Sequence, residues 1–265
     1  MGRILASSLL ISLLTACTTV SLQFPSSRFD SPETLGSGAN RFLFGLGVAS
    51  TQNVIFTDDA SIRPPDLSRP RIETNNPLVG RFGWGLFEKF DLGLKTSVGP
   101  APVRLTGKLQ LLGDPQGRAR SGNFSLALSG GVGYASPKWS GDHNGLLGPA
   151  GYRWNANVQA LLSEAALIAG YRLFDPLLLY AGAFYEDYRV NGRIKHEKSD
   201  NGLSPEAEYE FTYDGYQTGV NAGVRIGFGA HPTYLILEGV YSKTALSHGL
   251  AMKDTGFGAE LGCAF

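Results

Sequence analysis

The last ten residues, Gly256-Phe257-Gly258-Ala259-Glu260-Leu261-Gly262-Cys263-Ala264-Phe265, alternate strictly along the chain. Every second residue from Phe257 onward is apolar and larger than its neighbours, apart from Ala259, and the series ends on Phe265 itself. A β-strand points successive side chains to opposite faces, so this spacing predicts a strand with one apolar face. The other face carries glycines and Glu260.

The same period of two recurs upstream, from Arg41 onward. We expect ten alternating segments, near residues 41–49, 81–86, 90–95, 103–111, 124–134, 164–173, 177–188, 220–228, 235–242 and 256–265. Charged residues make up only 17% of the chain, below the roughly 25% of ordinary soluble domains. The chain also contains 35 glycines, which suits a sheet-rich protein that presents an apolar surface.

The links between these segments alternate in length. Short links at residues 88–89, 174–176 and 229–232 and an intermediate link at 113–123 would lie at one end of a barrel. Long links at residues 51–78, 136–153, 189–207 and 243–253 would lie at the other, together with one brief link at 97–102. Short turns at one end and long loops at the other are typical of a transmembrane barrel with an even strand count.

Residues 41–265 therefore resemble the outer-membrane β-barrel proteins of Gram-negative bacteria. The predicted fold is all-β, a transmembrane antiparallel up-and-down β-barrel of about ten strands. The resemblance implies an outward face in outer-membrane lipid and a terminal Phe265 that the barrel-assembly machinery reads. Aromatic girdles are expected at both membrane surfaces, with Trp139, Tyr152, Trp154, Tyr185 and Tyr209 at one and Phe42, Phe90, Phe124, Phe174, Phe228 and Phe265 at the other.

The first sixteen residues have the pattern of a signal peptide. Met1-Gly2-Arg3 is positively charged, residues 4–14 are mostly apolar, and Leu14-Thr15-Ala16-Cys17 follows. That tetrapeptide resembles the lipobox of bacterial lipoproteins, which implies cleavage after residue 16 and lipid attachment at Cys17. The alternative is an ordinary cleaved signal with an incidental cysteine. Residues 17–40 are then a lipidated N-terminus and a flexible periplasmic tether, and Cys263 is a free thiol on the lipid face.

The predicted inward face carries charges of both signs. They are Arg41, Arg81, Asp91, Lys95, Arg104, Lys108, Glu164, Arg172, Glu186, Arg225, Glu238 and Glu260. Such residues can pair across strands and fill the lumen, or they can line a narrow, slightly cationic pore. Around eight strands a barrel interior is just filled by side chains, so about ten strands favour the filled, ion-paired lumen.

Candidate catalytic residues lie in the long links. Asp58-Asp59 and Asp142-His143 could together activate a water molecule. Outer-membrane aspartyl-type proteases also have ten strands, but their paired acids are separated by one residue, unlike these adjacent ones. Ser247-His248 offers a nucleophile beside a base, but without a third, orienting group. The histidines and cysteines lack metal-ligand spacing, so we expect no metal and no cofactor.

These patterns favour a non-enzymatic outer-membrane barrel lipoprotein that is structural or interacts through its outer loops. An extracellular ligand would be bound by loops such as the charged stretch at residues 196–202. The alternatives are a small porin or transporter of polar solutes, a hydrolase at the outer rim, and a soluble ligand-binding barrel. Equal numbers of basic and acidic residues, 23 of each, argue against a nucleic-acid partner.

Overall fold

The computed structural model describes residues 17–36, 41–59, 71–143, 152–197, 207–228, 232–247 and 249–265. Within these ranges the regular elements are all strands: β1 (Cys17–Pro25), β2 (Phe42–Val48), β3 (Thr51–Asp59), β4 (Arg71–Asn75), β5 (Leu78–Phe87), β6 (Phe90–Ser97), β7 (Val103–Leu112), β8 (Phe124–Ala135), β9 (Lys138–His143), β10 (Tyr152–Phe174), β11 (Leu177–Glu197), β12 (Ala207–Gly227), β13 (Thr233–Leu246) and β14 (Ala251–Ala264). None of the described residues belongs to a helix long and apolar enough to cross a membrane.

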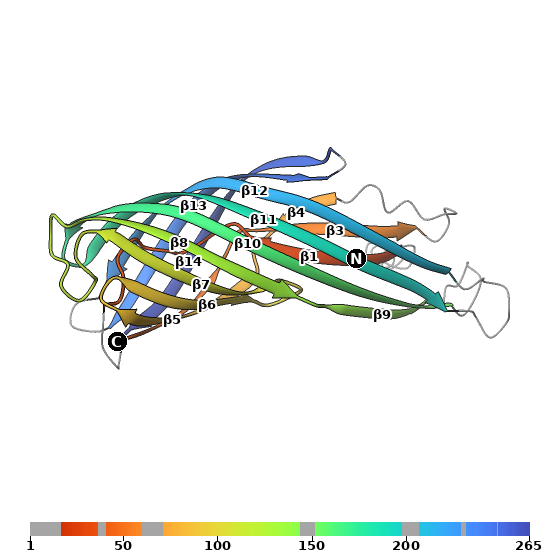
Figure 1. The fold of residues 1–265 in the computed structure, drawn as a ribbon, viewed down its shortest axis with the longest axis horizontal. Helices are drawn as coiled ribbons and strands as arrows, with labels where there is room; N and C mark the ends of the chain where they lie inside the picture. The colour runs from red at the N-terminus through yellow and green to blue at the C-terminus, as the bar shows by residue number, and fades with distance from the viewer. Residues whose placement is uncertain are drawn as a thin grey trace, which may run out of the picture.

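Ten of these strands close into a ring, in the order β2, β5, β6, β7, β8, β10, β11, β12, β13 and β14 (Figure 1). The ring closes where residues 259–264 of β14 pair with residues 43–48 of β2, and every neighbouring pair is antiparallel. Strand β9 pairs with the outer part of β10 and so extends the wall beyond the end of β8. The prediction of an antiparallel up-and-down barrel of about ten strands is confirmed.

The two faces of the wall differ as the alternation predicts. Large apolar side chains such as Phe44, Leu128 and Leu261 are about half exposed on the outside. Inward positions between them, such as Arg104 and Glu186, are almost completely buried. One end of the barrel carries the short links between strands and Phe265, and we call it the short-link end. The opposite end is the long-link end.

Strands β10, β11 and β12 are 23, 21 and 21 residues long, far more than the roughly 9–11 residues that cross a bilayer. The outer part of β11 lies in the predicted link 189–207, and the outer parts of β10 and β12 lie outside the predicted strands 164–173 and 220–228, so those predicted boundaries are wrong. The reason is that the apolar residues move from the outward positions to the inward positions along each strand, which we call a change of phase. On β11, Ala183 and Tyr185 face outward, whereas further along the strand Tyr188, Val190 and Ile194 face inward and are buried.

This change of phase creates an apolar core at the long-link end. Inward side chains of β10 to β13 pack there against Val20, Leu22 and Phe24 of β1. Trp154 is one of them and is only 8% exposed, so it does not belong to the predicted aromatic girdle. Around this core the outside of the wall carries charged pairs such as Arg193 with Glu210.

The N-terminal residues contradict the predicted flexible tether. Strand β1 pairs along its whole length with β3, which also pairs with β4, and this three-stranded sheet lies at the long-link end (Figure 1). The chain then continues through the inside of the barrel toward the short-link end. We call residues 26–36 the lumen segment. They are buried because strands on every side supply partners for their polar and charged groups.

Candidate functional site

The lumen segment has the composition of a loop, and two prolines flank or interrupt it, Pro25 and Pro32. Proline lacks the N–H that a sheet ladder requires, which disfavours strand formation here. Phe29 has a φ of 54°, a left-handed conformation that is unfavourable for a bulky residue. The segment is therefore held by its contacts with the wall and not by local regularity.

Arg28 forms the centre of the first contact region. Its guanidinium lies 2.6 Å from Glu164 and 2.7 Å from Glu186, and both carboxylates are buried. Arg104 of the wall lies 2.9 Å and 2.5 Å from the same two carboxylates. The Arg28 Cζ also lies 4.3 Å from the centre of the Phe184 ring. Two cations thus share two carboxylates, which offsets part of the cost of removing these charges from water.

Glu238 fixes the backbone of the lumen segment. Its carboxylate accepts hydrogen bonds from the backbone N–H groups of Arg28 at 2.6 Å and Phe29 at 3.1 Å. It accepts two more from the Tyr180 hydroxyl at 2.8 Å and the Asn221 amide at 2.9 Å. These four donors, two from the wall and two from the segment, satisfy a carboxylate that is fully buried.

Asp30 forms the second contact region, in the middle of the lumen. It lies 2.5 Å from the Lys95 ammonium and 3.4 Å from the Arg81 guanidinium. Arg81 in turn lies 2.6 Å from Glu260, which also accepts a hydrogen bond of 2.9 Å from the Tyr234 hydroxyl. Asp30 therefore joins the lumen segment to an ion pair that connects two strands of the wall.

Glu33 and its neighbours form the third contact region, near the short-link end. Glu33 makes an ion pair with Arg172 and is almost fully buried. The backbone N–H of Leu35 donates to both oxygens of Asp91 at 3.1 Å. Lys108 lies 3.2 Å from Asp91 and donates to the backbone oxygen of Glu33 at 2.7 Å. Both side-chain and backbone groups thus bind this end of the segment.

The structure places eleven of the twelve predicted lumen residues inside the barrel. Their relative exposure ranges from 0% for Glu186 and Glu238 to 16% for the Lys108 side chain. Arg41 is the exception, because it precedes β2 and is exposed at the short-link end. The sequence predicts ion pairs between strands of the wall alone. In the structure each contact region also contains one charged residue of the lumen segment, namely Arg28, Asp30 or Glu33. Their only sequence signal is a group of charges within a stretch rich in serine, threonine and proline.

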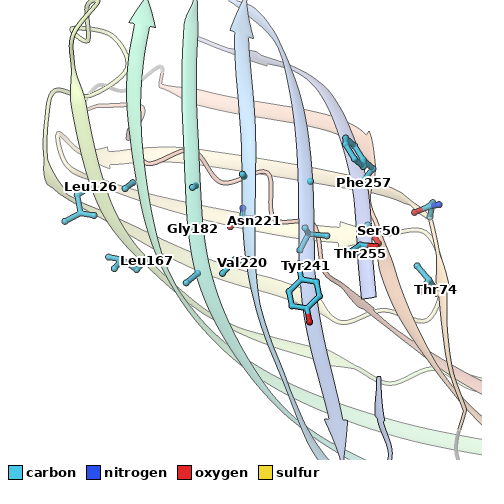
Figure 2. A pocket seen from close by; sticks show the side chains of 18 residues that line it. Ser50, Thr74, Leu126, Leu167, Gly182, Val220, Asn221, Tyr241, Thr255 and Phe257 are labelled. Carbon is cyan, nitrogen blue, oxygen red and sulfur yellow. The ribbon is translucent and has the colours of Figure 1, made fainter. Parts of the chain in front are cut away.

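Little space remains around Arg28 and Asp30 of the lumen segment. Two cavities of about 30 and 40 Å³ lie beside Arg28 and Asp30, each with room for about one water molecule. A larger hollow of about 1020 Å³ lies along the wall from β8 to β14 and reaches Ser50 and, on β4, Thr74 (Figure 2). Exposed, outward-facing side chains such as Leu167, Val220 and Tyr241 line it, so it is an apolar surface hollow and not a passage through the lumen.

The candidate catalytic residues are not assembled into a site by the described part of the chain. Asp58 and Asp59 lie on β3, and Asp142 and His143 lie on β9 of the other sheet, with side chains outside the described residues. Ser247 accepts a hydrogen bond of 3.2 Å from the Asp214 backbone, and His248 lies outside the described residues. In the same ranges, no group of three or more histidine, cysteine, aspartate or glutamate residues is placed to hold a metal ion.

Several solved structures resemble this one. The outer membrane protease OmpT from Escherichia coli is 12% identical, with a TM-score of 0.43 and coverage of 85% of this chain and 93% of that chain. The outer membrane channel DcaP of Acinetobacter baumannii is 10% identical, with a TM-score of 0.21 and coverage of 88% and 100%. Outer-membrane expressed OmpT of Vibrio cholerae is 11% identical, with a TM-score of 0.19 and coverage of 88% and 100%. No protein-family model and no curated protein matches the sequence. These neighbours are bacterial outer-membrane barrels, and their low similarity assigns neither family nor activity to this chain.

Proposed function

We propose that this protein is an outer-membrane barrel lipoprotein whose lumen is closed by its own N-terminal segment. Its role is structural, or it acts through the surface at the long-link end, and it does not conduct solutes in this state. The observation that carries the proposal is the lumen segment, which is buried from Ser26 onward and bound to the wall in three contact regions. The two cavities beside Arg28 and Asp30, of about 30 and 40 Å³, are too small for a continuous water-filled path past these residues.

Single-channel conductance in planar bilayers tests this proposal against the porin alternative. We expect the full chain to give no discrete current steps. A variant that lacks residues 18–36 should give steps that scale with salt concentration, because the polar wall of the lumen would then be hydrated. A heat-dependent shift on gels shows whether that variant is still a folded barrel. Discrete, salt-dependent steps from the full chain would establish the porin alternative instead.

We also propose that Cys17 carries the lipid, and the support is the sequence Leu14-Thr15-Ala16-Cys17. Strand β1 begins at Cys17, whose backbone lies opposite Asp59 at the outer end of β3. Cys17 is therefore at the long-link end, so that a lipid attached there would lie on the cell surface if the long links are external. Cells grown with a fatty-acid analogue should label the protein, and Cys17→Ser should abolish that labelling. Full labelling of Cys17→Ser would refute the assignment.

A further inference from the structure

A separate cavity of about 410 Å³ opens at the short-link end of the barrel. Side chains from β10, β11, β12, β13 and the link before β8 surround it. Among these side chains are those of Gln116, Arg172, Leu178, Arg225, Thr233 and Tyr234. Its volume lies within the range of small-molecule sites, which are typically apolar with a few polar groups in fixed positions.

Arg225 differs from the other buried basic residues of the lumen. It is only 6% exposed, and its Cζ lies 4.4 Å from the centre of the Tyr234 ring. Within the described residues it has neither a hydrogen bond nor an ion pair, whereas Arg28, Arg81, Lys95, Arg104, Lys108 and Arg172 each contact a carboxylate. Guanidinium has five N–H donors, and a buried cation without an acceptor is strongly unfavourable.

The charged neighbours of Arg225 leave its positive charge uncompensated. Arg81 and Arg172 repel it, and Glu33 attracts it. The carboxylate of Glu33, however, is already bound by Arg172 and by the Asn123 amide. Asp175 lies at the exposed rim of the cavity, where its carboxylate accepts a hydrogen bond of 2.9 Å from the Ser121 backbone.

We propose that this cavity binds a small organic carboxylate, with Arg225 as its ion-pair partner. A guanidinium can donate two parallel hydrogen bonds to a carboxylate, a geometry that lysine cannot reproduce. One uncompensated charge matches a monoanion better than a phosphate dianion. The apolar side chain of Leu178 and the ring of Tyr234 suit the carbon skeleton of such a ligand, and Gln116 and Thr233 supply further polar groups.

This inference is independent of the proposed function, because the cavity lies beside the lumen segment and does not require a closed lumen or a lipid. Butyrate is a suitable probe, with uncharged butyramide and inorganic phosphate for comparison. Saturation-transfer NMR on the full-length protein in detergent should show saturable butyrate binding and much weaker binding of butyramide. Phosphate that competes with butyrate at equal or lower concentration would overturn the assignment to a carboxylate.

Variants locate the site. Arg225→Met should weaken butyrate binding at least about tenfold, because a hydrogen-bonded charge pair is lost. Gln116→Trp keeps the arginine but fills the cavity, so it should weaken binding to a similar extent even if Arg225→Met folds poorly. Arg189→Met changes an exposed arginine at the opposite end and should leave binding unchanged. Wild-type affinity in a folded Arg225→Met or in Gln116→Trp would refute the site.

Discussion

Arg28 shows how one residue couples the N-terminal segment to the barrel wall. It lies between two buried carboxylates that belong to the neighbouring strands β10 and β11. Without Arg28, Arg104 would remain as the one ion-pair partner of Glu164 and Glu186 among the described residues. A buried carboxylate that loses a partner is more costly than a lost surface pair, since water cannot replace that partner.

We therefore predict that Arg28→Met lowers the free energy of unfolding by roughly 3 kcal/mol. Urea unfolding in detergent, followed by tryptophan fluorescence, measures the change. Arg193→Met is the matched control, because Arg193 pairs with Glu208 and Glu210 on the exposed outer hairpin, and its stability should equal that of the wild type. Equal stability of Arg28→Met and wild type would show that this contact contributes nothing to the folded state.

Phe29 is a point at which the lumen segment fits closely against the wall. A Cβ added at Gly258 of β14 would lie 2.5 Å from the Phe29 ring and 2.8 Å from the Ser27 hydroxyl. The absence of a side chain at Gly258 thus makes room for the ring. The left-handed backbone at Phe29 is held in the same place by the hydrogen bond to Glu238.

We predict that Gly258→Leu displaces Phe29 and releases the lumen segment, with overpacking of about 1–3 kcal/mol as the driving force. The variant should give current steps in planar bilayers that the wild type lacks. Gly130→Leu is the control, because a Cβ at that position meets its nearest atom, the Glu164 backbone oxygen, at an ordinary 3.5 Å. A folded Gly258→Leu that remains silent would indicate that the segment closes the lumen without this fit.

At the scale of elements, the sequence predicts those strands whose environment is the same along their length. Strands β7 and β8 keep one apolar face and one polar face throughout, and the period of two identifies both. The outer parts of β10, β11 and β12 are missed because their apolar face changes from outside to inside. A strand that leaves lipid and begins to enclose an apolar core must reverse its pattern, so a search for one continuous phase ends at the reversal.

The lumen segment is missed for a different reason. Its residues bind partners that are far away in sequence, such as Glu238, which lies 210 residues from Arg28, and Asp91, which lies 56 residues from Leu35. No local period can encode contacts with strands on every side of a ring. The inward charges of the wall are predictable from alternation, but the residues that complete their pairing are not. The same limit applies to Arg225, whose missing partner becomes evident only when all lumen contacts are known.

At the scale of the whole molecule, the outward face decides between a membrane barrel and a soluble one. Leu128 on β8 and Leu167 on β10 lie opposite each other in register, and both are nearly half exposed on the outside of the wall. In water these side chains would form an unfavourable apolar surface, whereas in a bilayer they would contact lipid tails. Charge introduced at this position should therefore have opposite consequences in the two environments.

We predict that Leu128→Arg destabilises the protein in lipid vesicles by about 2–4 kcal/mol, the cost of an arginine near the midplane of the membrane. Thr212→Arg, on the exposed outer part of β12, should leave stability unchanged, because that position lies beyond the reversal of phase and faces water. Urea unfolding from vesicles compares the two variants with the wild type. In a soluble barrel both substitutions would be tolerated, and Leu128→Arg would improve solubility without detergent. A Leu128→Arg variant with the stability of the wild type would therefore contradict the assignment of this barrel to the membrane.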